Sequence, residues 1–134
     1  MKTLEDSRAA ALLQAQEKAN ELFHAVESKG LIRLGISETK LNQDVYDLAK
    51  EMYGISTYWH KRIVRAGRNT LAPYDENPPD LTIGEDDILF LDLGPVFEEW
   101  EADFGRTFVV GSDPVKLKLR NDIEKGFANR KSVV

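Results

Sequence analysis

The sequence predicts an α+β fold, in which two helices precede a group of antiparallel strands and a third helix follows them. Apolar residues recur at three- and four-residue steps over residues 6–29 and again between Ser37 and Gly54, as on one face of a helix. Residues 87–93 are apolar on both faces, which favours a strand. Helical segments followed by a run of strands are typical of α+β architecture.

The first predicted helix covers residues 6–29. Asp6 or Ser7 can cap its start, and Gly30 can end it. Its mostly apolar stripe consists of Leu12, Gln16, Ala19, Phe23 and Val26.

A short connection over residues 31–36 leads to the second predicted helix. Ser37 caps it and Gly54 closes it. Its apolar stripe consists of Leu41, Val45, Leu48 and Met52.

Short segments rich in strand-forming residues occupy the region after Tyr58. The strand candidates are residues 62–66, 87–93, 97–100 and 103–110, and Gly67 begins a turn after the first of them. Residues 73–79 begin and end with proline and predict an ordered loop rather than a central strand. Asp113 and Pro114 then cap and start a final helix, whose stripe is Val115, Leu119, Ile123 and Phe127.

Composition excludes several classes of protein. A length of 134 residues fits one domain spanning residues 1–134. The 42% apolar and 31% charged residues argue against wholesale disorder. The net charge of −5 argues against non-specific nucleic-acid binding, and the absence of cysteine excludes disulfides and thiolate metal sites. With neither a signal peptide nor an apolar run of ~20 residues, a cytoplasmic location without membrane association is expected.

Two aspartates in the predicted strand region are candidate metal ligands. Asp92 shares a strand face with Ile88 and Phe90, and burying a carboxylate there requires compensation. Asp103 follows after an odd separation of 11 residues, which in a simple hairpin places the two side chains directly opposite each other on one face. Two such carboxylates repel each other unless a cation lies between them. The alternative is that both are turn or edge residues facing water.

Several motifs resemble one known family. Residues 92–94 have the sequence Asp-Leu-Gly. After eight further residues comes the sequence Asp-Phe-Gly-Arg-Thr at residues 103–107. This pattern resembles the first metal-binding segment of the pita-bread metallopeptidases, which include methionine aminopeptidase, aminopeptidase P, Xaa-Pro dipeptidase and creatinase. Trp100 matches an aromatic position of that segment. Residues 63–70 and 84–88 are similar to the family's pocket strand and to its lead-in to the metal strand.

The resemblance implies half of a pita-bread fold, with the Asp92 and Asp103 pair as metal ligands. It implies a divalent metal such as Mn, Co, Zn or Fe, which acts as a Lewis acid and activates water for hydrolysis. The family's second half supplies a histidine and two glutamates, and this sequence ends at Val134 before any such residues. We therefore expect an incomplete, truncated site, and we assign no catalytic residue.

Four further residues are expected to contact substrate: His60, Tyr74, Trp100 and Arg106. The family's substrate-facing histidine is missing from residues 71–74, where Tyr74 can donate a hydrogen bond but cannot shuttle a proton near neutral pH. Three of these assignments have an alternative. His60 can be a loop or partly buried histidine, Trp100 a core residue, and Arg106 a member of a structural ion pair.

Three functions remain open from the sequence. The chain can be the N-terminal half of a metal-dependent aminopeptidase or Xaa-Pro dipeptidase, completed by a complementary C-terminal half and acting on a peptide-like substrate. It can be a homodimeric half-fold that binds a metal or ligand without peptidase activity. It can also be a non-catalytic module whose aspartates are vestigial.

Overall fold

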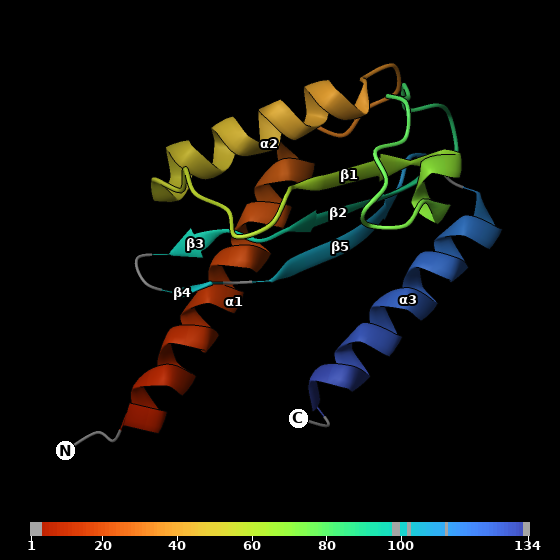
Figure 1. The fold of residues 1–134 in the computed structure, drawn as a ribbon. Helices are drawn as coiled ribbons and strands as arrows, with labels where there is room; N and C mark the ends of the chain where they lie inside the picture. The colour runs from red at the N-terminus through yellow and green to blue at the C-terminus, as the bar shows by residue number, and fades with distance from the viewer. Residues whose placement is uncertain (1–3, 98–99, 102, 112, 133–134) are drawn as a thin grey trace.

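The predicted order of two helices, antiparallel strands and a final helix is confirmed, but the single strand predicted over residues 97–100 is wrong, because Phe97 and Trp100 belong to two different strands that pair with each other. The computed structural model of the protein describes residues 4–97, 100–101, 103–111 and 113–132, with side chains for residues 4–96, 103–111 and 113–123. In chain order the elements are α1 (Leu4–Ser28), α2 (Glu38–Tyr53), β1 (Ile63–Ala66), the 3-10 helix η1 (Gly67–Leu71), β2 (Ile88–Leu93), β3 (Val96–Phe97), β4 (Trp100–Glu101), β5 (Phe104–Val109) and α3 (Pro114–Ser132) (Figure 1).

Antiparallel pairing joins the strands into a three-stranded sheet of order β1-β2-β5 and a two-stranded sheet of β3 and β4. Leu93 of β2 faces Phe104 of β5, and Val96 of β3 faces Glu101 of β4. The two ladders therefore keep one register along a single hairpin, and residues 94–95 interrupt it next to Asp92.

One face of the sheet forms the core with α1 and α2. Leu89, Leu91 and Leu93 are fully buried there, as the two-residue period predicts. The ring of Phe23 on α1 makes edge contacts with Phe104 and Phe108 at centroid distances of 6.3 and 6.1 Å. Burying each such side chain contributes ~1.5–3 kcal/mol, so this face is the main source of stability.

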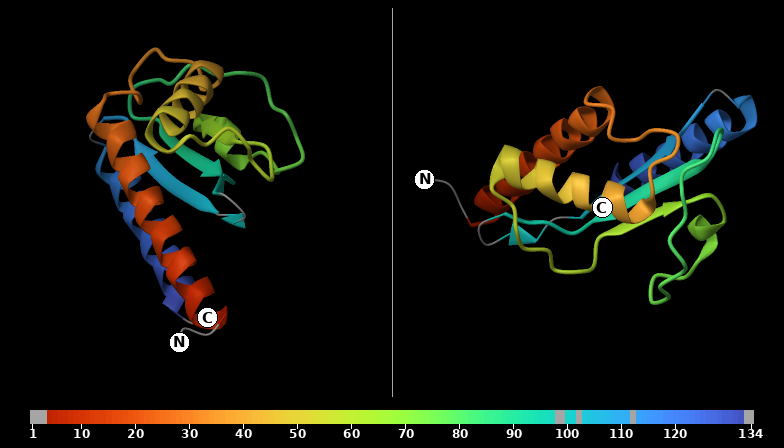
Figure 2. Two further views of the ribbon diagram at one scale, coloured as in Figure 1. Left: turned by 90° about the vertical axis from the view of Figure 1, so that its left-hand side faces the viewer. Right: turned by 90° about the horizontal axis from the view of Figure 1, so that it is seen from above.

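The α1 stripe is only half confirmed. Ala19, Phe23 and Val26 are buried, but Leu12 is 55% exposed and Gln16 is also exposed. Figure 2 shows that the N-terminal half of α1 extends past the sheet, and within the described part of the chain the side chains of this half are mostly exposed.

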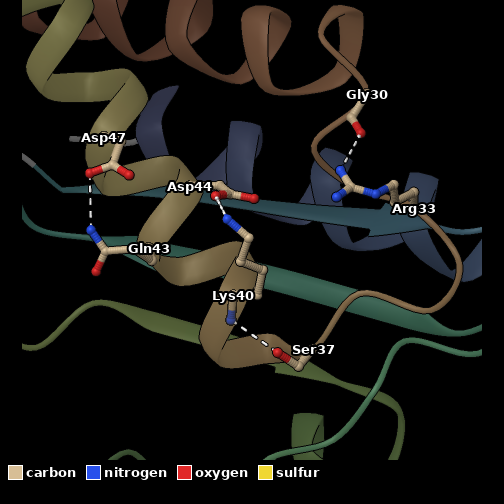
Figure 3. Close-up of polar contacts among 7 residues, drawn as sticks. All are labelled: Gly30, Arg33, Ser37, Lys40, Gln43, Asp44 and Asp47. Carbon is tan, nitrogen blue, oxygen red and sulfur yellow. Dashed lines mark hydrogen bonds and ion pairs between the residues drawn. The ribbon is translucent and has the colours of Figure 1, made fainter.

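The ends of α2 confirm the predicted caps. The Oγ atom of Ser37 accepts a hydrogen bond from the backbone N–H of Lys40 at 3.1 Å (Figure 3). Gly54 takes the left-handed conformation (φ 70°) and donates its N–H to Lys50 at 2.8 Å. A second cap comes from the long loop between η1 and β2 (residues 72–87), because Asp80 Oδ1 accepts the N–H of Thr39 at 2.9 Å. The loop is thereby attached to the start of α2.

The start of α3 is also as predicted, but its stripe is not buried. Asp113 Oδ1 accepts the N–H groups of Val115 and Lys116 at 2.9 and 3.2 Å. Val115, Leu119 and Ile123 are 77%, 49% and 44% exposed, and the side chain of Phe127 lies outside the described residues. No helix within the described ranges is both long and apolar enough to cross a membrane.

Candidate metal site

Asp92, Asp103 and His60 come together where the β2–β5 hairpin is interrupted. Asp92 lies on β2, Asp103 directly precedes β5, and His60 lies in the segment between α2 and β1. The Nε2 atom of His60 is 3.9 Å from Asp92 Oδ1 and 4.0 Å from Asp103 Oδ1. One potential ligand atom from each residue lies within 4.8 Å of the other two. The set combines two oxygen donors and one nitrogen donor, which suits a divalent transition metal or zinc.

The register between the two aspartates differs from the prediction. Asp92 faces Gly105, so Asp103 is displaced by two residues and is a diagonal neighbour rather than a directly opposed one. The separation of 11 residues gives the correct shared face, but the hairpin is two residues longer than a directly opposed pair requires. Diagonal neighbours remain within reach of each other across one face of an antiparallel pair.

The electrostatics of the pair are those of two crowded carboxyl groups. Partial burial raises the pKa of Asp92 above its ordinary value, and the negative charge of Asp103 raises it further. The nearby His60 opposes this shift, while a hydrogen bond with Asp103 adds to it. Because Asp103 is 74% exposed and Asp92 is 41% exposed, water reaches the pair and a cation would be able to enter.

His60 is held in place by the strand interruption. Trp59 donates its backbone N–H to Gly94 at 2.9 Å, and Val96 donates to Thr57 at 2.9 Å. A Cβ atom at Gly94 would lie 2.5 and 2.6 Å from two atoms of the His60 ring. The imidazole therefore occupies the space that any side chain at position 94 would fill, and only glycine permits this approach.

A cavity of about 500 Å³ lies beside the cluster. Ile88 and Phe90 line it from β2, Leu119 and Ile123 line it from α3, and both aspartates border it. The sheet face opposite the core is therefore only partly covered. An apolar cavity with a few clustered polar groups is the usual form of a small-molecule or peptide site.

The structure brings Tyr74 towards the cluster but directs Arg106 elsewhere. The Tyr74 ring lies 6.0 Å from the His60 ring. Although Arg106 borders the cavity, its guanidinium hydrogen bonds to Asn20 on α1 at 3.0 Å and stacks over Phe23 at 4.9 Å. It faces Leu91 rather than Asp92 in the ladder, so its head group lies on the core face and packs against a helix. The side chain of Trp100 lies outside the described residues.

Two buried charges that the sequence analysis missed shape the loop that carries Tyr74. Glu38 is 6% exposed and accepts hydrogen bonds from Ala66 N–H at 2.7 Å and Leu81 N–H at 3.0 Å, and from the Asn69 amide. Arg65 is 5% exposed and donates to the carbonyl oxygens of Ala72, Pro73, Tyr74 and Glu76. The only available signal for Arg65 is its position inside a short apolar strand.

The hairpin, its clustered aspartates and the helices behind the sheet define part of a pita-bread metallopeptidase domain. The family model "Metallopeptidase family M24" matches residues 10–127, and the chain belongs to that family.

Individual relatives agree with this assignment. A candidate Xaa-Pro aminopeptidase of Mycoplasma genitalium is 28% identical over 115 residues, covering 84% of this chain and 32% of that protein. The Xaa-Pro dipeptidase of Bacillus anthracis superposes with a TM-score of 0.71 at 26% identity, over 88% of this chain and 32% of that one. The prolidase of Pyrococcus furiosus superposes with a TM-score of 0.67 at 25% identity, over 88% of this chain and 34% of that one. The chain thus spans about a third of the length of these relatives.

Proposed function

We propose that this chain supplies the Asp92 and Asp103 ligands of a divalent-metal site that hydrolyses peptides, of the kind that its relatives' names describe: Xaa-Pro aminopeptidase and Xaa-Pro dipeptidase. The observation that carries the proposal is the placement of both carboxylates on one sheet face beside the apolar cavity. Family membership supports a divalent metal such as Mn, Co, Zn or Fe.

The residues present fit such a metal. Burial and the nearby charge of Asp103 raise the pKa of Asp92, and a cation that neutralises the two carboxylates would remove the repulsion between them. When bound, a divalent metal supplies Lewis-acid activation of a carbonyl or of water. The chain's own residues do the rest. The carboxylates orient the site, and the apolar lining from Phe90, Leu119 and Ile123 excludes water from a bound side chain.

Metal binding is tested on the untagged chain by thermal unfolding with Mn²⁺, Co²⁺ or Zn²⁺. A metal at 100 times its dissociation constant should stabilise the fold by ~2.7 kcal/mol. Asp92→Asn and Asp103→Asn should each abolish most of that gain. Asp75→Asn, an exposed aspartate beside Tyr74, is the matched control and should keep it. If the chain shows no stabilisation by any of the three metals, the proposal is wrong.

A second candidate function is a homodimeric half-fold that binds a metal or a small ligand without peptidase activity. It is favoured by the apolar side chains around the cavity, since Leu71, Leu119 and Ile123 are 86%, 49% and 44% exposed. A second copy, or a complementary segment of polypeptide, would cover this face and could add ligands. Light scattering at micromolar concentration separates these cases, because a monomer mass contradicts the dimer. Hydrolysis of an Xaa-Pro dipeptide by the dimer would contradict the non-catalytic form.

A further inference from the structure

We infer that His60 is a metal ligand, and that with Asp92 and Asp103 it forms a three-ligand site for one divalent cation within this chain. The inference rests on the proposed metal-binding role of the aspartates and goes beyond it. From the sequence, His60 is expected to contact substrate. A ligand set of one imidazole and two carboxylates favours Zn²⁺, Co²⁺ or Mn²⁺ over Mg²⁺ or Ca²⁺.

The carbonyl group of Lys61 determines which nitrogen of the His60 ring must carry a proton. The Nδ1 atom of His60 lies 2.6 Å from the carbonyl oxygen of Lys61. A carbonyl oxygen only accepts hydrogen bonds, so Nδ1 carries a proton, and Nε2 is the ring nitrogen whose lone pair a metal would bind. Metal-binding histidines show the same arrangement, in which the second ring nitrogen donates to a carbonyl or carboxylate and fixes the ring orientation.

The Nε2 atom of His60 faces the carboxylates of Asp92 and Asp103. Among the described residues Nε2 has no hydrogen-bond partner, and the two carboxylate oxygens lie 3.9 and 4.0 Å away. Nε2 therefore faces two anionic oxygens, and a cation bound between the three atoms would be attracted by both carboxylates. Two ligand atoms bound at ~2.1 Å from one metal can be at most ~4.2 Å apart. Both separations therefore already fall within the span that one cation can bridge.

The His60 ring is held in one position by its neighbours. The side chain of His60 is only 9% exposed, its edge packs against Trp59 at a centroid distance of 4.4 Å, and it fills the space above Gly94. A surface histidine would lose rotamer freedom on binding a metal, whereas this one is already fixed. Such preorganisation is what distinguishes a built site from a chance cluster of charges.

The chain offers a clean spectroscopic test, because His24 and His60 are its two histidines. In the untagged chain labelled with ¹⁵N-histidine, Zn²⁺ should shift the Nε2 resonance of His60 and leave that of His24 unchanged. This measurement needs no substitution at the site, so it is independent of whether a variant folds. A titration in which the metal binds without moving the His60 resonances overturns the inference.

Calorimetry with Zn²⁺ and Co²⁺ provides the second readout. His60→Gln should weaken binding by about tenfold or more, and Gly94→Ala should do the same by displacing the ring. His24→Gln, the matched control on exposed α1 surface, should bind as the unaltered chain does.

The outcomes separate the two proposals. If Asp92→Asn abolishes binding while His60→Gln and Gly94→Ala leave it unchanged, the aspartate site stands and the role of His60 is wrong. If the unaltered chain binds neither metal, both are wrong.

Discussion

The carboxylate of Glu38, at the start of α2, lies 2.9 Å from the side-chain amide nitrogen of Asn69 in η1. Asn69 also donates to the carbonyl oxygen of Pro79 at 2.8 Å. One buried acid–amide contact therefore connects α2, the turn after β1 and the far end of the long loop. In Figure 2 this loop, drawn in green, extends away from the sheet, and its attachment depends on such contacts.

Glu38→Gln should destabilise the protein by ~2–4 kcal/mol. The Glu38 carboxylate now accepts hydrogen bonds from three groups. The amide of a glutamine would direct its own N–H group at one of these donors, and that buried donor would lose its partner. Chemical denaturation measures the loss. Glu51→Gln, an exposed change on the same helix, should stay within ~0.5 kcal/mol of the parent. Equal stability of the two variants would contradict the proposed role of Glu38.

Arg65→Lys should release the loop of residues 72–76, while the amides of the sheet keep their protection from hydrogen exchange. A lysine presents one compact ammonium group, which cannot span the four carbonyl oxygens that the guanidinium reaches. Hydrogen exchange resolved by residue should show faster exchange confined to this loop. The matched change is Arg68→Lys at an exposed position of η1. Unchanged exchange in the Arg65 variant would show that the loop is held by other contacts.

Asp92→Asn should stabilise the metal-free protein at neutral pH, by roughly 0.5 kcal/mol because the side chain is partly exposed. The raised pKa means that the folded state holds the Asp92 proton at pH values where the unfolded chain has lost it. Ionising Asp92 therefore costs folding free energy as the pH rises from about 3.8 through the raised pKa.

The stabilisation by Asp92→Asn should be largest at pH values above the raised pKa of Asp92 and should vanish below a pH of about 3.8. Melting temperatures of parent and variant between pH 4 and pH 8, in the presence of a chelator, check this. A gain that does not change with pH would mean that the charge is not its source.

Phe23→Ala should cost ~3–5 kcal/mol, because Phe23 is 2% exposed and contacts two aromatic rings of β5. Leu12→Ala on the same helix should cost less than ~0.5 kcal/mol, since that side chain is 55% exposed. Thermal unfolding of both variants compares the packed and the projecting halves of α1. A large loss for Leu12→Ala would mean that a second copy or another chain covers it.

Local patterns predicted the elements well because their causes are local. Ser37 and Gly54 are read from cap chemistry, and the two-residue period of β2 assigns Asp92 to the correct face. Burial along a helix depends on what lies opposite. The patterns of Leu12 and Leu119 are apolar and helical, yet nothing in the described chain covers them fully.

The sequence predicted that Asp92 and Asp103 share one face of the sheet, but it did not predict how they cluster with His60. Register depends on where the hairpin turns, and the pairing of Phe97 with Trp100 sets a register in which Gly105, rather than Asp103, faces Asp92. The position of His60 depends on the segment between α2 and β1, which is distant from Gly94 in sequence but forms backbone hydrogen bonds with Gly94 and Val96. Arg106, by contrast, turned to α1 because a strand residue one step from Gly105 must face the other side.

Arg65 fixes the backbone path of the long loop without depending on which side chains the loop carries. All four of its acceptors are main-chain carbonyls, and every amino acid provides one of these. The side chains at positions 72–76 can therefore be exchanged without loss of the anchor. In evolutionary terms, position 74, whose ring lies beside His60, is free to vary in chemistry on a backbone of constant path, so selectivity can change there while the scaffold stays the same.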